Sequence, residues 1–140
     1  MKKLTAIFVF SVVMLVSCKT AAVSDFNKIQ QIIKSNTWVL QDESGSVYGF
    51  NGQEVTMNFI EDSGLQAAGF AGCNNYFSGV ELYPDKITFT QPGSTMMACP
   101  DMDGENAFLD LLTQVNGYEI VGSEFNLYKD KIILMRFRAK

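Results

Sequence analysis

Cysteine and the acidic residues are the side chains of this sequence that are best suited to chemistry. There are three cysteines, Cys18, Cys73 and Cys99, and 15 aspartates and glutamates, whereas histidine is absent. Without histidine, Ser-His-Asp and Cys-His catalytic arrangements are excluded, and the commonest metal ligand and general base is missing. Two carboxylates could still form a glycosidase-type pair, but no pair stands out among the acids. We therefore expect no catalytic residue, no metal site, no cofactor and no enzymatic activity.

One acidic segment, residues 100–106, is superficially similar to the start of a calcium-binding loop. Asp101, Asp103 and Glu105 alternate as the first ligands of an EF-hand do. An EF-hand loop closes with a glutamate at position 12, but the residue at that position here is Leu112, which cannot bind a cation. Capping of a following helix explains these acids better, because carboxylates are favourable at a helix N-terminus.

The N-terminus has the pattern of a bacterial lipoprotein signal. Lys2 and Lys3 precede an apolar run over residues 4–16, which has the length of a signal-peptide core and falls short of the roughly 20 residues that span a bilayer. The Leu-Val-Ser sequence before Cys18 resembles a lipobox, whose cysteine receives a diacylglycerol and becomes the first residue after cleavage. We therefore expect a signal peptide at residues 1–17 and lipidation of Cys18; a plain secreted protein and an uncleaved anchor are the alternatives.

The mature chain is expected to be one small domain on a tether in the cell envelope. Residues 18–24 are short and mostly small or polar, as a lipidated tether would be, and residues 25–140 suit a single domain. Lys19 follows the cysteine where an aspartate would signal inner-membrane retention, so we expect an outer-membrane lipoprotein facing the periplasm if the source has two membranes. Loss of Lys2 and Lys3 lowers the basic residues from 11 to 9 against 15 acidic ones, which disfavours nucleic-acid binding.

Lipidation of Cys18 would leave Cys73 and Cys99 as an even pair in an oxidising compartment. A structural disulfide is the favoured interpretation, and closing a loop of this length would stabilise the fold by roughly 3.5 kcal/mol. Two buried free thiols remain an alternative. A redox-active pair is a further one, although the sequence has no C-x-x-C motif to lower a thiol pKa.

The periodicity of the apolar residues predicts a mainly β, α+β domain. Residues 25–35 carry apolar side chains at helical spacing, and residues 105–115 do so more clearly, with Asp103 as the expected N-cap and Gly117 just past the end. The expected strands are residues 38–40, 54–60, 65–71, 76–82, 86–90, 118–121, 124–128 and 131–138. Strands so short and numerous favour a small antiparallel sheet that curls or closes like a β-barrel, with one inserted helix and a short N-terminal helix.

Three landmarks are more specific than periodicity. They are Trp38–Leu40, the G-F-A-G-C-N-N-Y sequence of Gly69–Tyr76, and the S-T-M-M-A-C sequence of Ser94–Cys99 followed by a helix with Phe108. Their order resembles the META-domain family, which includes the HslJ-type heat-shock lipoproteins, over about residues 36–137. The resemblance implies a small antiparallel barrel-like domain with a helix before the last hairpin. Members are associated with envelope stress, altered drug sensitivity and, in some parasites, virulence, but the resemblance implies no catalytic residues or cofactor.

The glycines and the asparagine of the second landmark are interpreted as structural. Gly69 and Gly72 could mark a bulge or a close approach of two backbones. Gly72 and Asn74 tolerate positive φ, and asparagine can bond its own backbone, which favours a backbone role over a binding role.

The leading hypothesis is a non-enzymatic envelope lipoprotein related to stress or drug tolerance. Its expected contacts are the membrane, through the lipid on Cys18, and an envelope protein or a small apolar ligand; we expect a monomer. The alternative is a lipocalin-like binding module, which needs an interior cavity of about 300 Å³ or more. A carboxylate enzyme would instead require acids that converge in a cleft.

Overall fold

The computed structural model describes residues 19–140, whose side chains are described from residue 25 onwards. Its helices are α1 (Lys19–Ser35) and α2 (Asp103–Gln114), with a short 3-10 helix η1 (Phe50–Gly52). Its strands are β1 (Trp38–Asp42), β2 (Gly45–Ser46), β3 (Thr56–Glu61), β4 (Leu65–Phe70), β5 (Asn75–Leu82), β6 (Ile87–Phe89), β7 (Gly93–Ser94), β8 (Gly117–Val121), β9 (Glu124–Lys129) and β10 (Ile132–Ala139). Every expected strand is present, and the short strands β2 and β7 are additional.

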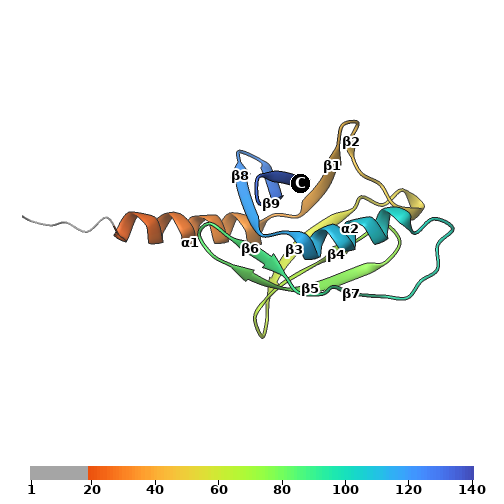
Figure 1. The fold of residues 1–140 in the computed structure, drawn as a ribbon, viewed down its shortest axis with the longest axis horizontal. Helices are drawn as coiled ribbons and strands as arrows, with labels where there is room; N and C mark the ends of the chain where they lie inside the picture. Colours follow the sequence, from red (N-terminus) through yellow and green to blue (C-terminus); the bar gives the residue numbers. More distant parts are fainter. Residues whose placement is uncertain (1–18) are drawn as a thin grey trace, which may run out of the picture.

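The strands form one antiparallel sheet that curls into a nearly closed barrel, as the sequence predicted (Figure 1). Their order is β6-β5-β4-β3-β1-β10-β9-β8, with β2 beside β1 and β7 beside β5. The end strands β6 and β8 contact each other without forming a ladder within residues 19–140. Tyr118 on β8 spans this seam, because its hydroxyl donates to the carbonyl oxygens of Tyr83 at 3.0 Å and Pro84 at 3.3 Å.

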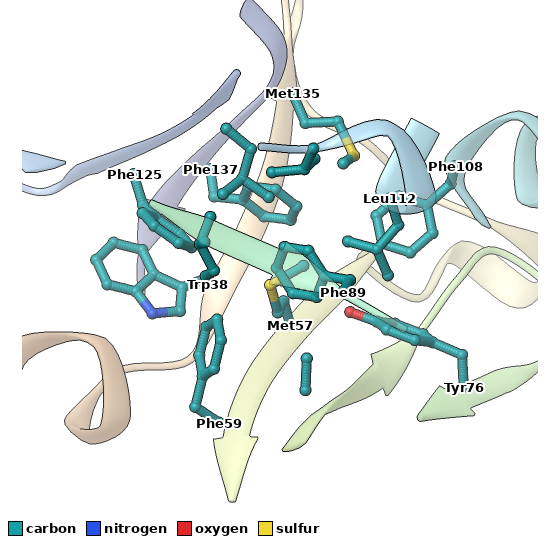
Figure 2. Close-up of a cluster of buried hydrophobic side chains, with 14 of the residues drawn as sticks. Trp38, Met57, Phe59, Tyr76, Phe89, Phe108, Leu112, Phe125, Met135 and Phe137 are labelled. Atoms are coloured by element: carbon teal, nitrogen blue, oxygen red, sulfur yellow. The ribbon is translucent and has the colours of Figure 1, made fainter. Parts of the chain in front are cut away.

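Large apolar side chains fill the barrel. Along β3, Met57 and Phe59 are buried and alternate with more exposed residues, which confirms the predicted half-buried strand. Trp38, Phe125 and Phe137 are fully buried, and their rings form a cluster with centroid distances of 5.0 Å for Trp38–Phe125 and 6.2 Å for Phe125–Phe137 (Figure 2). Burying each such side chain stabilises the fold by roughly 1.5–3 kcal/mol.

Gly64 and Gly69 are needed by the backbone at the two ends of β4. Asp62, Ser63 and Gly64 form the turn between β3 and β4, and Gly64 has a φ of 151°. A Cβ on Gly69 would lie 2.1 Å from the carbonyl oxygen of Thr56. The expected close approach of two backbones is therefore confirmed at Gly69.

Helix α2 covers one side of the barrel with the apolar stripe that its sequence predicted. Phe108 and Leu112, one turn apart, are buried, and Figure 2 shows them facing Tyr76 and Phe89. The Phe108 ring meets the Tyr76 ring edge to face, with centroids 5.2 Å apart. The helix thus closes part of the barrel and brings its own N-terminal turn beside the β4–β5 loop.

The start of α2 differs from the expectation in its capping. Asp103 is the first helical residue rather than the N-cap, and Met102 occupies the cap position without a side-chain bond. Asp101 accepts the backbone N–H of Asp103 at 2.9 Å, which satisfies one of the free N–H groups at the helix start. Gly117 opens β8 instead of ending the helix, because Val115 is already extended.

Helix α1 begins earlier than predicted. It starts at Lys19 and so includes residues 19–24 of the expected tether, because Ala21 and Ala22 favour helix strongly and no Gly or Pro interrupts the segment. The helix extends away from the barrel in Figure 1. The expected signal peptide at residues 1–17 and the expected lipidation site Cys18 lie outside the described residues. No helix within residues 19–140 has the length and hydropathy of a membrane span.

Candidate functional site

The β4–β5 loop carries the landmark glycine, cysteine and asparagine. Gly72 has a φ of 131°, a conformation that favours glycine, and it lets the chain turn into Cys73. The Sγ atoms of Cys73 and Cys99 lie 1.99 Å apart, with their Cα atoms 6.1 Å apart, so the structure brings the two predicted partners to disulfide distance. Cys73 is 1% exposed.

The carboxylate of Glu105 holds this loop from the first turn of α2. Its Oε2 accepts the backbone N–H of Cys73 at 2.9 Å and that of Asn74 at 2.5 Å, and its Oε1 accepts the Asn74 amide at 2.8 Å. Glu105 is only 4% exposed. The interpretation of Glu105 as one of three helix-capping acids is therefore wrong, because its side chain turns away from its own helix and bonds a different segment.

Asn74 connects the loop to the segment before Cys99. Its Oδ1 accepts the backbone N–H of Met97 at 2.7 Å and the hydroxyl of Thr95 at 2.8 Å, and its Nδ2 donates to the carbonyl oxygen of Met97 at 3.1 Å. Asn74 does not have positive φ. The structural interpretation of this residue is supported, but the predicted reason is wrong: its side chain bonds the segment that follows β7, and Glu105 on α2, rather than its own backbone.

These contacts form a polar cluster, which consists of the buried residues Cys73, Asn74 and Glu105 and the exposed residues Thr95 and Met97. Both carboxylate oxygens of Glu105 and both amide atoms of Asn74 are bonded within the cluster. Nowhere in residues 19–140 do three Cys, Asp or Glu side chains come together as a metal ion requires. The arrangement holds three segments together: the β4–β5 loop, the stretch before Cys99 and the first turn of α2.

A groove lies beside this cluster, between α2 and the β1–β2 hairpin. Figure 1 shows the hairpin rising away from the sheet, and the space between it and α2 contains a cleft of about 440 Å³. Leu40 and Val47 form one wall, Phe108 and Leu111 the other, and β10 from Ile133 to Arg136 completes the lining.

A second cleft of about 370 Å³ continues the first towards the β4–β5 loop. The two clefts share four lining residues, Leu40, Val47, Gly104 and Phe108. Gly49 and Gly72 lie at the far end, where their backbones touch: a Cβ on Gly49 would fall 2.0 Å from the Gly72 carbonyl oxygen. We call these two clefts together the α2 groove.

The α2 groove is apolar in the middle and charged at its edges. Asp42 lies at one end and Asp101 at the other, and Arg136 lies on the β10 side. The hydroxyl and backbone N–H of Ser44 donate to the Asp42 carboxylate, both at 2.7 Å, and lower the pKa of Asp42 below its ordinary value. Tyr48 and Phe50 are exposed at the rim. Such a groove suits a ligand that has apolar groups in its middle and charged groups at its ends.

The sequence predictions locate only part of this site. Cys73 and Cys99 were paired by counting cysteines, and the structure places them together. The α2 groove was not predicted, because its walls come from β1, α2 and β10, whose separation along the chain hides their proximity. The filled interior argues against a lipocalin-type cavity inside the barrel, since Trp38, Phe125 and Phe137 occupy it.

Comparisons with known proteins agree on one fold. The model of the META domain family matches residues 30–140. A solved protein from Burkholderia xenovorans, determined by NMR, is 25% identical, with a TM-score of 0.60 over 81% of this chain and 87% of that chain. A second NMR structure is 15% identical, with a TM-score of 0.57 over 76% of this chain and 90% of that chain. Among curated proteins, none matches this sequence.

Proposed function

This chain belongs to the META-domain family, and on that basis we propose that it is a non-enzymatic lipoprotein of the bacterial envelope that supports envelope integrity under stress by binding a partner in its α2 groove. The family provides the fold and the envelope context. The binding role rests on the α2 groove, and the anchoring role rests on the lipobox at Cys18.

Helix α1 suits the role of a stalk between a lipid anchor and the domain. Its 17 residues would extend about 25 Å, and its last turns pack on the barrel through Ile29, Ile32 and Ile33. The Trp38 indole donates to the Ile33 carbonyl oxygen at 3.0 Å, and Lys34 pairs with Glu61 at 2.7 Å. A helix fixed in this way would present the domain at a defined distance from the membrane surface.

The α2 groove is the single observation that carries the binding role. Monomeric proteins use clefts of roughly 300–1,000 Å³ with apolar walls and a few charged groups to bind ligands. Both clefts of the α2 groove fall in this range. A small apolar molecule in the same groove is the second candidate, because the same volume and lining would accept it.

Anchoring is tested by replacing Cys18. The wild-type chain should incorporate labelled palmitate and partition with membranes, whereas Cys18→Ala should do neither. Recovery of unlabelled, soluble wild-type protein would contradict the anchor.

The stress role is tested by filling the α2 groove. Gly104 lines both clefts, a Cβ there meets no atom within 4 Å, and its φ is ordinary, so Gly104→Trp should fill the groove without straining the backbone. Asn106→Trp adds the same side chain to the same helix at an exposed position outside the groove lining. A deletion strain should become sensitive to heat, detergent and hydrophobic antibiotics, and Asn106→Trp but not Gly104→Trp should restore resistance. A deletion strain that behaves like its parent would contradict the proposal.

A further inference from the structure

Strand β10 has an unpaired edge inside the α2 groove. The ladder between β1 and β10 runs only from Trp38↔Ala139 to Gln41↔Arg136. Strand β10 continues to Ile132, and over residues 132–135 it pairs with β9 alone among residues 19–140. The backbone groups of this stretch that point away from β9 are therefore free to bond another strand.

The sequence explains why β1 leaves its neighbour at this point. Asp42 pairs with Gly45, whose φ is 124°, so the chain reverses and β1 turns away with β2. The register between β9 and β10 shifts between Ile133 and Met135, which leaves Leu134 as the bulged residue and increases the local twist of β10. These two deviations open a gap between β1 and β10 beside residues 132–135. The same two strands are paired from Arg136 to Ala139.

The gap is bordered by a strand edge and by apolar side chains. Its open edge is β10, while Leu40, Val47 and the α2 residues Phe108 and Leu111 provide apolar walls on both sides. A strand added to a sheet edge alternates its side chains between the two faces, so every second side chain would enter the apolar cleft.

The charges at the groove ends favour a basic ligand. Asp42 and Asp101 lie at opposite ends of the α2 groove, and Arg136 is the one basic residue among the described residues that line it; the Glu105 carboxylate is already engaged by Cys73 and Asn74. The bonds from Ser44 keep Asp42 in its ionised form by lowering its pKa. The chain as a whole is acidic, with 15 acidic against 11 basic residues, so a cationic segment would also be attracted from a distance.

From this geometry we infer that the α2 groove takes up an extended peptide segment of a partner protein as an added strand along residues 132–135 of β10. The segment alternates apolar and polar side chains and carries a lysine or arginine that faces Asp42 or Asp101. This inference rests on the proposed binding function and specifies its ligand. A lipid acyl chain would fill the apolar cleft but would leave the strand edge and the carboxylates unused.

A library of random twelve-residue peptides displayed on phage provides the probe. The lipidated full-length mature chain is held in lipid nanodiscs, and empty nanodiscs remove peptides that bind lipid. Enriched peptides should alternate apolar and polar residues and contain Lys or Arg. They should bind wild-type and Asn106→Trp chains equally and should bind Gly104→Trp about tenfold or more weakly, provided that the melting temperatures of the variants match the wild type. Asp101→Asn should weaken binding about threefold, with less effect at high salt.

Amide hydrogen exchange distinguishes strand addition from simple occupancy. A bound peptide should slow the exchange of the outward amides within residues 132–135 and leave those of β4 unchanged. Failure to enrich any peptide that Gly104→Trp rejects, or unchanged exchange in residues 132–135, would overturn the inference. The peptide inference can fail while the proposed function stands. In that case Gly104→Trp would still fail to restore stress resistance to the deletion strain, and the groove would bind a different ligand.

Discussion

The Glu105 carboxylate lies 2.9 Å from the backbone nitrogen of Cys73. Cys73, whose Sγ lies beside that of Cys99, is therefore also held by α2. The two contacts join three segments that are distant in sequence: the β4–β5 loop, the stretch before α2 and the helix itself. Because α2 forms one wall of the α2 groove, these contacts also fix the position of that wall.

Removing the Glu105 carboxylate should destabilise the fold. Glu105→Ala leaves the N–H groups of Cys73 and Asn74 without partners in a buried place, at a cost of about 3 kcal/mol in the free energy of unfolding. Glu105→Gln retains one acceptor oxygen and should cost about half as much. Urea unfolding measures both. Asp103→Ala, at an exposed position in the same helical turn, is the control and should cost at most about 0.5 kcal/mol. Equal losses for Asp103→Ala and Glu105→Ala would mean that Glu105 acts only on the helix dipole.

A disulfide between Cys73 and Cys99 is the second prediction. Alkylation of the unfolded, unreduced mature protein followed by mass spectrometry should find no free thiol on either residue. The Cys73→Ala, Cys99→Ala double variant should lose about 3.5 kcal/mol of stability, because the link no longer restricts the unfolded chain. Dithiothreitol should lower the stability of the wild type by a similar amount and leave the double variant unchanged. Two alkylated cysteines in the untreated protein would disprove the link.

The stability of the fold should fall at alkaline pH. Burial raises the pKa of Tyr76, and burial together with the charge of Asp85 raises the pKa of Tyr118. Above pH 10 the unfolded chain loses these protons while the folded chain keeps them, so stability is complete below about pH 10 and falls as pH rises. Unfolding measured from pH 8 to 11 should show this decline.

At neutral pH, Tyr118→Phe should cost about 1 kcal/mol, because it removes the hydrogen bonds to Tyr83 and Pro84 across the seam. Tyr128→Phe removes an exposed bond to Glu119 on the neighbouring strand and should cost less than about 0.5 kcal/mol. The reverse ranking of the two variants would show that Tyr118 does not secure the seam.

Two glycine variants should have opposite effects. Gly69→Ala places a Cβ 2.1 Å from the Thr56 carbonyl oxygen, and separating β3 from β4 should cost about 3 kcal/mol or more. Gly104→Ala meets open space at the start of α2 and should stabilise the protein by up to about 0.5 kcal/mol through helix propensity. Thermal unfolding gives both values. A tolerated Gly69→Ala would mean that β3 and β4 separate easily at this point.

Local features of the sequence predicted the elements well. Alternation along Val55, Met57 and Phe59 predicted β3, and the spacing of Phe108 and Leu112 predicted α2. These predictions succeeded because the apolar period of a segment depends on its own backbone geometry. The start of α1 was missed because the polar residues around Lys19 suggested a tether, whereas the alanines that follow continue the helix.

The sequence by itself determined the strands, the two helices and the resemblance to the META-domain family, and it indicated Cys73 and Cys99 as candidate disulfide partners. Only the tertiary structure decided where Glu105 points, what Asn74 bonds and where β1 leaves β10. A repeating pattern tells which face of a segment is buried but not which other segment it meets. Glu105 and Asn74 are 31 residues apart, and they meet because the antiparallel order of the sheet and the packing of α2 bring the helix start over the β4–β5 loop.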